Sequence, residues 1–213
     1  MTEPNQDATM SASPEDLARH AEKMAKKKAA RDKIMATKTG EKGLIVVHTG
    51  KGKGKSSAAF GMIFRHIAHG RKCAVVQFIK GAMSTGERDL ILRHFSDLCE
   101  FHTMGEGFTW ETQDRQRDIA AAEAAWAVSR QMLQDPSIHF VVLDELNIAL
   151  KHGYLDLDQV LSDIQARPPM QHVIVTGRGA KPEMVELADT VTEMGMLKHA
   201  FQAGIRAQKG VEL

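Results

Sequence analysis

The sequence predicts an α/β fold, in which helices cover a mainly parallel sheet of about six strands. Three observations favour this fold. Short apolar runs alternate with helix-like segments through most of the chain, as is typical of parallel sheets with right-handed crossovers. The first apolar run leads into a loop of alternating glycine and lysine. The 213 residues, 43% of them hydrophobic and 26% charged, are enough for one such domain and an additional segment.

We expect two parts: a disordered start with a basic helical arm in residues 1–40, and the α/β domain in residues 41–213. Ser13 and Pro14 predict a helix start, because serine caps helices and proline suits their first position. Between residues 14 and 38 there are eight basic and four acidic side chains, with few large apolar residues. Two interpretations stay open for the arm. It is either a solvated, partly frayed helix, or a lid that folds over an anionic ligand of its own or a partner subunit.

The stretch from Gly43 to Ser57 has the parts of a phosphate-binding loop: an apolar strand, a glycine-rich turn, Lys-Ser and a helix. Glycines at alternate positions let the backbone approach phosphate oxygens, and the N–H groups that begin the next helix point at the same anion. Lys55 can contact the outer phosphates, and the Ser56 hydroxyl is suited to bind Mg²⁺. A glycine-rich turn without a ligand is disfavoured, because closely spaced lysines repel each other unless an anion joins them.

The loop is one residue shorter than the common G-x-x-x-x-G-K-[ST] motif, because Thr49 stands where that motif has a glycine. A phosphate loop on a parallel sheet indicates a three-layer, P-loop NTPase-like (RecA-like) fold. The residues that we expect to bind the nucleotide in this stretch are Thr49, Gly50, Lys51, Gly52, Lys53, Gly54, Lys55, Ser56 and Ser57.

The rest of the domain continues the alternation of strands and helices. The expected strands are 73–79, 100–104, 139–143, 172–176 and 190–194. The expected helices are 87–95, 113–133, 157–166 and 182–188. Ligands bind at the carboxyl ends of parallel strands, and the loops 49–57, 144–147 and 177–179 all leave such ends.

Asp144 and Glu145 directly follow an apolar strand, as Mg²⁺-binding carboxylates do in nucleotide-binding proteins. We expect both to serve Mg²⁺, and the sequence leaves open which of them contacts the ion. Arg178 stands between two glycines at a strand end, where it either contacts the nucleotide or is an exposed turn residue. Arg65, nine residues after Ser56 on the same helix, is an equal candidate for nucleotide binding and for a surface salt bridge.

Phe108 and Trp110 lie in a glycine-flanked loop of a chain that has only 5% aromatic residues. Two interpretations stay open for them: they line an apolar pocket for a flat second ligand, or they anchor the loop in the core. Trp126, on an alanine-rich helix, is expected to be a packing residue.

Several other classes of function are disfavoured. The histidines lack the spacing of metal ligands, no G-x-S-x-G motif is present, and the N-K-x-D motif of GTPases is missing. The net charge of +1 gives no general reason to expect nucleic-acid or membrane binding. Cys73 and Cys99 are expected to be reduced core residues, and two cysteines without a secretory signal indicate a cytoplasmic protein.

The sequence resembles the P-loop type of ATP:corrinoid adenosyltransferase, a family that includes cob(I)yrinic acid a,c-diamide and cob(I)alamin adenosyltransferases. The resemblance runs from about Gly43 to the C-terminus, whereas the arm resembles the family only in being basic and helical. Family members usually have threonine where this chain has Ser56, and either hydroxyl can bind Mg²⁺. The motifs that carry the resemblance are G-K-G-K-G-K-S-S, G-F-T-W-E-T-Q, V-V-L-D-E-L, T-G-R-G and K-H-A-F-Q-A-G-I-R-A-Q-K-G.

This resemblance implies transfer of the 5′-deoxyadenosyl group of ATP to the Co(I) of a corrinoid, with release of the whole triphosphate. The cobalt is then the nucleophile, so the enzyme positions its substrates and stabilises charge. The family also implies that Ser56 and Glu145 bind Mg²⁺, and that Phe108 and Trp110 lie under the corrin and exclude its lower axial ligand. It further implies a flavin or flavodoxin-type reductant and a homodimer, in which the N-terminal helix can cover the partner's site.

From the residues alone, two other functions stay open: a P-loop ATPase or kinase that acts at the γ-phosphate, and a non-catalytic nucleotide-binding switch. Cobalamin, cobinamide and cobyrinic acid a,c-diamide are equal candidates for the corrinoid, so a biosynthetic and a salvage role in making adenosylcobalamin are both compatible with the sequence.

Overall fold

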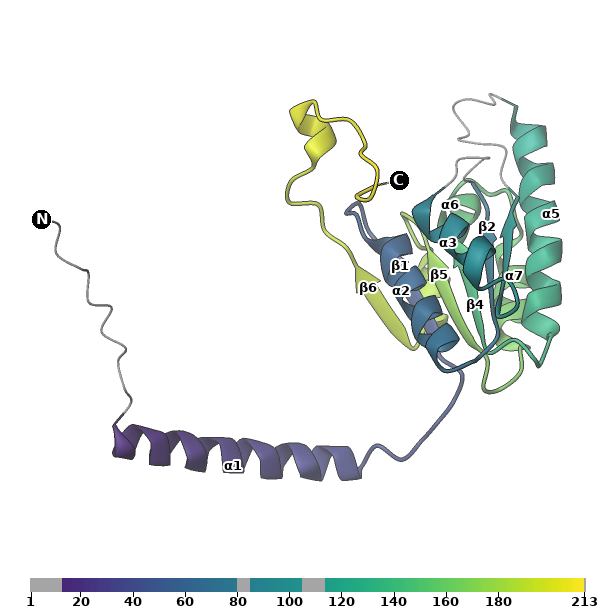
Figure 1. The fold of residues 1–213 in the computed structure, drawn as a ribbon. Helices are drawn as coiled ribbons and strands as arrows, with labels where there is room; N and C mark the ends of the chain where they lie inside the picture. Colours follow the sequence, from purple (N-terminus) through teal and green to yellow (C-terminus); the bar gives the residue numbers. More distant parts are fainter. Residues whose placement is uncertain (1–12, 80–84, 105–113, 213) are drawn as a thin grey trace, which may run out of the picture. The chain divides into compact units, whose positions relative to one another are not determined.

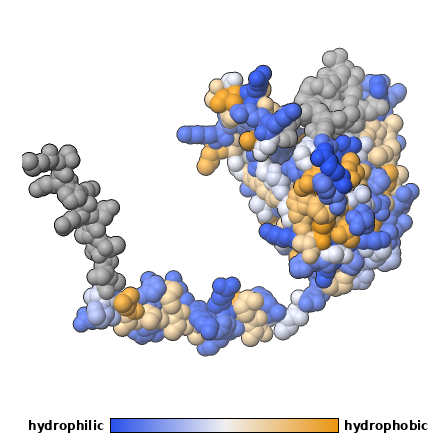
Figure 2. All heavy atoms as spheres, in the orientation of Figure 1, coloured by the Kyte–Doolittle hydropathy of each residue, from blue (hydrophilic) through white to orange (hydrophobic). Residues whose placement is uncertain are grey.

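The computed structural model describes residues 13–79, 85–104 and 114–212, and the chain divides into two compact units, Met1–Glu41 and Lys42–Leu213. The first unit contains helix α1 (Pro14–Ala36), which Ser13 caps by accepting a hydrogen bond from the N–H of Asp16. None of the residues of α1 is buried, and Figure 2 shows hydrophilic residues along this helix with hydrophobic ones between them. Neither α1 nor any other helix in the described residues is long and apolar enough to cross a membrane.

The second unit is built on a six-stranded sheet in which every pairing is parallel. The strand order is β3-β2-β4-β5-β1-β6, so that β5 separates β1 from β4 (Figure 1). This arrangement confirms the predicted parallel α/β fold. The strands are β1 (Ile45–Thr49), β2 (Cys73–Gln77), β3 (Cys99–Thr103), β4 (Phe140–Asp144), β5 (His172–Thr176) and β6 (Thr190–Glu193).

Helices cover both faces of this sheet and give it three layers (Figure 1). On one face α2 (Lys55–Ala68) and α3 (Gly86–His94) pack against strand residues such as Val46 and Val75. The neighbouring strand residues Val47 and Val76 point to the opposite face of the sheet. There they pack into a separate hydrophobic cluster, which includes Trp126 as expected. Such alternation follows from the period of two along a strand. The helices of the second face are α5 (Arg115–Gln134), α6 (Leu146–Lys151), α7 (Leu157–Gln165) and α8 (Pro182–Leu187).

The structure differs from the sequence-based expectation in three elements. The sequence does not predict α6 or the 3₁₀ helix Ala200–Ala203, because segments of six and four residues are too short to display a helical period. The strand expected to reach residue 79 ends at Gln77, although Phe78 and Ile79 remain buried.

Candidate functional site

The glycine-rich loop lies at the carboxyl end of β1 and leads into α2. Gly50 and Gly54 have φ values of 96° and 103°, which glycine adopts without strain. A Cβ atom at Gly50 would lie 2.5 Å from the carbonyl oxygen of Met194, and one at Gly52 would lie 2.4 Å from that of Gly195. The N–H of Gly52 donates to the Met194 oxygen at 2.7 Å. The chain that follows β6 therefore forms one wall of the loop, and glycine is required for this close approach.

Lys55 is the first residue of α2 and is only 7% exposed. Its Nζ donates a hydrogen bond to the carbonyl oxygen of Gly52 at 2.6 Å. Burial, the largest cause, lowers the pKa of Lys55; the Glu145 carboxylate raises it, and the positive charges of Arg178 and Lys53 lower it again. Several cations thus face one loop, an arrangement that an anion would stabilise.

Asp144 accepts hydrogen bonds from the side chains of three different elements. Ser56 Oγ and Thr176 Oγ1 each donate to Asp144 Oδ1 at 2.7 Å, and Gln77 Nε2 donates to Asp144 Oδ2 at 2.9 Å. Asp144, Gln77 and Thr176 are all buried. β5 lies between β1 and β4, and α2 contacts all three strands. The Ser56 hydroxyl at the start of α2 therefore reaches Asp144 at the end of β4. A hydroxyl of the glycine-rich loop is therefore in direct contact with the carboxylate that ends β4.

Glu145, the next residue, is the only described residue besides glycine with a positive φ, at 65°. Its N–H donates to Thr176 Oγ1 at 2.9 Å, which fixes the turn to the end of β5. A Cβ atom at Gly177 would lie 3.0 Å from Asn147 Cβ and 3.3 Å from Glu145 Cα, so the turns after β4 and β5 are closely packed. A non-glycine residue in this conformation is typical of functional turns, where the surrounding contacts hold the strain.

The remaining expected residues of the loop lie around this centre. Thr49 Oγ1 accepts a hydrogen bond from the N–H of Ala180 at 3.2 Å, which joins the ends of β1 and β5. Lys53 forms an ion pair with Glu212 of the C-terminal tail at 3.1 Å. Lys51, Ser57 and Arg178 are exposed. The structure thus brings the loop 49–57, Asp144-Glu145 and Arg178 to one end of the sheet.

Arg65 is not brought to this end. It lies in the last turn of α2 and lines a pocket with residues that precede β2 and begin β5. Nine residues of helix rise about 13 Å, which separates Arg65 from Ser56 along the helix axis. This placement removes Arg65 from the loop site. Phe108 and Trp110 lie outside the described residues.

Sequence reasoning misses Gln77 and Thr176, two members of the Asp144 network. Each directly follows three or more apolar residues at the carboxyl end of its strand, and that position was the available signal. Only the order of the strands, with β4 between β2 and β5, identifies the carboxylate that both side chains reach.

The site offers few ligands for a metal from the protein alone. Among the described residues, no group of three or more His, Cys, Asp or Glu side chains could hold a metal ion. Cys73 and Cys99 are free and buried, as expected, and burial raises the pKa of each thiol to about 12. The oxygen donors Ser56, Asp144 and Glu145 suit Mg²⁺, which in proteins commonly takes its other ligands from phosphate and water.

Comparison with known proteins gives consistent matches over the whole described domain. A family model described as ATP:corrinoid adenosyltransferase BtuR/CobO/CobP matches residues 41–213, and one described as Cob(I)alamin adenosyltransferase N terminal matches residues 9–35. The chain is 65% identical over 203 residues to a corrinoid adenosyltransferase of Pseudomonas aeruginosa, which covers 95% of this chain and 100% of that protein. It is 64% identical over 198 residues to one from Sinorhizobium sp., covering 92% of each. It is 46% identical over 194 residues to corrinoid adenosyltransferase CobA of Salmonella typhimurium, covering 91% of this chain and 97% of that protein.

Proposed function

The chain belongs to the ATP:corrinoid adenosyltransferase family and is a transferase that moves the adenosyl group of ATP to a corrinoid; on this premise we propose which of its residues perform the reaction. The observation that carries the proposal is the 2.7 Å hydrogen bond from Ser56 Oγ to Asp144 Oδ1, which joins a phosphate loop to a carboxylate. An ATPase or kinase that acts at the γ-phosphate is disfavoured by the family.

We propose that the loop 49–57 binds the triphosphate of ATP. Its backbone and the first turn of α2 supply N–H groups, and Lys51, Lys53 and Lys55 supply positive charge. Arg178 supports this interpretation, because it is near enough for its positive charge to lower the pKa of Lys55 and so adds a cation to the same loop. A departing triphosphate carries more negative charge than one transferred phosphoryl group, which accounts for the additional lysines. Lys53 would exchange its ion pair with Glu212 for the triphosphate.

The proposal includes Mg²⁺ at the same site. Asp144 already accepts hydrogen bonds from Ser56, Thr176 and Gln77, so we assign to it the task of orienting the Ser56 hydroxyl. We assign direct contact with the ion to Ser56 Oγ and to the carboxylate of Glu145, whose Oε2 atom is buried. When bound, Mg²⁺ neutralises charge that develops on the departing triphosphate.

The corrinoid Co(I) acts as the nucleophile. It donates an electron pair to the ribose 5′ carbon, the cobalt–carbon bond forms, and the C5′–O bond breaks with its electron pair leaving on the triphosphate. No side chain has to take or supply a proton in this step. The protein therefore contributes by aligning two substrates and by stabilising the charge of the leaving group.

We propose that Phe108 and Trp110 lie under the corrin and exclude the lower axial ligand of cobalt. Axial ligands stabilise Co(II) relative to Co(I). Removing the lower ligand therefore makes the reduction of Co(II) to Co(I) easier. Phe108→Ala and Trp110→Ala should therefore damage turnover with a flavin reductant far more than turnover on pre-formed Co(I). Equal losses with the two electron sources would contradict this assignment.

Further parts of the proposal concern partners. A reduced flavin or flavodoxin-type protein would supply the electron, and cobalamin, cobinamide or cobyrinic acid a,c-diamide would accept the adenosyl group. We propose a homodimer in which the basic arm covers the site of its own or of the partner subunit. The match of residues 9–35 to a family described as Cob(I)alamin adenosyltransferase N terminal supports a role for the arm in the enzyme, whichever subunit it covers. A cytoplasmic location is supported by the two free, buried cysteines.

The test is a product analysis. The protein is incubated with ATP, Mg²⁺ and chemically reduced cob(I)alamin, and the cobalt–carbon bond is followed by its absorption spectrum while the phosphates are separated by chromatography. We expect adenosylcobalamin and triphosphate in equal amounts. ADP and inorganic phosphate without a cobalt–carbon bond would refute the proposal.

A further inference from the structure

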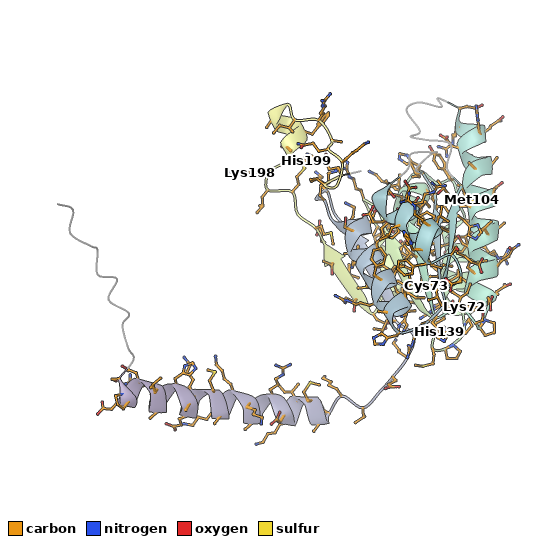
Figure 3. The ribbon with its side chains drawn as sticks, in the orientation of Figure 1. Lys72, Cys73, Met104, His139, Lys198 and His199 are labelled. Atoms are coloured by element: carbon orange, nitrogen blue, oxygen red, sulfur yellow. The ribbon has the colours of Figure 1, made fainter. Side chains whose placement is uncertain are left out.

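A second cluster of basic side chains lies at the amino ends of the strands, at the end of the sheet opposite to the loop site. Lys72 and His139, which lie close together there, are labelled in Figure 3 at the end of the sheet away from Met104. The backbone N–H of His139 donates to the carbonyl oxygen of Lys72 at 2.8 Å. Beside them is a pocket of about 320 Å³ whose lining residues are Arg65, His66, His69, Arg71 and His172.

The two arginines of this pocket have no acidic counterpart. Within residues 13–79, 85–104 and 114–212, neither Arg65 nor Arg71 forms a salt bridge with a carboxylate. The C-terminal end of α2 attracts cations and accounts for Arg65 and His66 on its last turn. Arg71 lies at the same helix end, because its N–H donates to the carbonyl oxygen of His66 at 3.0 Å. The helix end does not account for His172, which begins β5. Arg65 and Arg71 are exposed, so water screens their mutual repulsion, and an anion held between them would gain from both charges.

Two of the imidazoles are held in fixed orientations by the backbone. The N–H of Leu44 donates to Nδ1 of His172 at 3.0 Å, so that nitrogen carries no proton and Nε2 of His172 carries one. Nδ1 of His66 lies 3.0 Å from the carbonyl oxygen of Met62, which can only accept, so Nδ1 of His66 is protonated. The His66 ring also stacks on Phe140, with ring centroids 4.5 Å apart. In both rings Nε2 is the nitrogen left for a ligand of the pocket.

We propose that this pocket binds a small, doubly charged oxyanion of the phosphate class, between the guanidinium groups of Arg65 and Arg71 and the Nε2 atoms of His66 and His172. The site is separate from the nucleotide loop and does not depend on the proposed reaction. It gives Arg65 a ligand-binding role at a place other than the one expected from the sequence.

Binding of an anion should add a proton to His66. The charged and titratable groups around that ring are Arg65, Arg71, His69, His139 and His172. Burial, the largest cause, lowers the pKa of His66; the hydrogen bond to Met62 opposes this shift, and Arg71, His139 and His69 lower the pKa further. The pKa of His172 is also lowered, by burial as the largest cause and then by His66, Arg71, Arg167 and His139. A proton added at Nε2 of His66 keeps the Met62 hydrogen bond and creates a donor for the anion. A proton added to His172 would instead break its bond from Leu44.

The experiment is a titration of the full chain with sulfate, whose charge does not change near neutral pH, followed by NMR of the histidine side chains. His48, whose Nδ1 lies 3.3 Å from the carbonyl oxygen of Lys55, reports on the nucleotide loop, and His66 reports on the pocket. We expect sulfate to shift the His66 and His172 signals even when ATP and Mg²⁺ occupy the loop. The affinity should be about fivefold higher below the lowered pKa of His66 than well above neutral pH, because one charge is added near the anion.

Arg71→Gln should weaken this sulfate binding about fivefold or more. The matched control is Arg130→Gln, which removes the same charge from α5 on the opposite face of the sheet and should leave the affinity unchanged. Thermal unfolding of both variants checks that they fold. In His66→Gln the pH dependence should disappear. Sulfate shifts confined to His48, or equal weakening in the two arginine variants, would overturn the proposal.

Discussion

Lys55 is buried, and this burial, with the positive charges of Arg178 and Lys53, outweighs the attraction of the Glu145 and Asp144 carboxylates, which lowers the stability of the fold. Because burial lowers its pKa in the folded chain, the unfolded chain binds the proton more tightly. The charged lysine therefore destabilises the fold at neutral pH, and this penalty is lost as the pH rises through the lowered pKa of Lys55 toward 10.5. Such a conflict between stability and binding is typical of functional sites.

Lys55→Met should abolish ATP binding and raise the stability of the nucleotide-free protein by about 1 kcal/mol at neutral pH. Thermal unfolding with and without ATP measures both effects. The wild type should gain about 2.7 kcal/mol at an ATP concentration of 100 times Kd, and the variant should gain nothing. The advantage of the variant without ATP should shrink in alkaline buffer. A less stable variant at neutral pH would mean that the hydrogen bond to Gly52 outweighs the cost of burial.

Gln77 is a positioning residue in our account, because it donates to the Asp144 oxygen that Ser56 does not contact. Gln77→Leu should raise the Mg²⁺ concentration needed for half-maximal turnover and reduce stability by about 1–3 kcal/mol. The control is Ser129→Ala, which removes a similarly buried hydrogen bond within α5 and should reduce stability without changing the Mg²⁺ requirement. The same Mg²⁺ requirement in both variants would show that Gln77 has only a structural role.

At the scale of elements, the strands could be predicted well because each is a short apolar run, and the loop could be predicted because glycine and lysine alternate in it. Ser56 and Asp144 were both predicted for one site, since Ser56 ends the glycine-lysine loop and Asp144 directly follows an apolar run. Gln77 and Thr176 could not be assigned, because a polar residue at the end of a strand has a partner only once the strand order is known. Arg65 could not be placed from the sequence for another reason. It shares α2 with Ser56, but the two residues lie at opposite ends of that helix.

Gln171 links the second face of the domain to the sheet. It is buried, and its Nε2 donates to the carbonyl oxygen of Met132 in the last turn of α5 and to those of Asp135 and Ile138 between α5 and β4. Gln171→Ala should lower the free energy of unfolding by about 2–3 kcal/mol, because it removes the donor shared by these oxygens. Urea unfolding measures the loss. Gln159→Ala, a surface control with one hydrogen bond to Asp163, should cost no more than about 0.5 kcal/mol. Similar losses in the two variants would contradict this role.

At the scale of the whole molecule, the chain combines a domain that buries a two-sided core with an arm that buries nothing. The composition of the arm predicts both its helix and its exposure, because basic and alanine residues favour helix but provide little apolar surface. The sequence of the arm does not predict what it covers, because the helix has no continuous apolar face that would indicate a packing partner.

Deletion of residues 1–38 should leave the thermal midpoint of the domain unchanged and raise KM for the substrates, because the arm contributes positive charge but no core. Deletion of residues 1–12 alone serves as the control and should change neither quantity. A large drop in the midpoint after the longer deletion would show that α1 supports the fold.

The central claim is that the loop holds a triphosphate that departs whole while the bond to the ribose 5′ carbon breaks. The most direct measurement replaces ATP by its β,γ-imido analogue, whose β–γ bridge resists hydrolysis, in a reaction with Mg²⁺ and cob(I)alamin. We predict that adenosylcobalamin forms at a rate comparable to that with ATP, with release of the intact imido-triphosphate. No cobalt–carbon bond with the analogue, together with ADP and phosphate as the products from ATP, would contradict the claim.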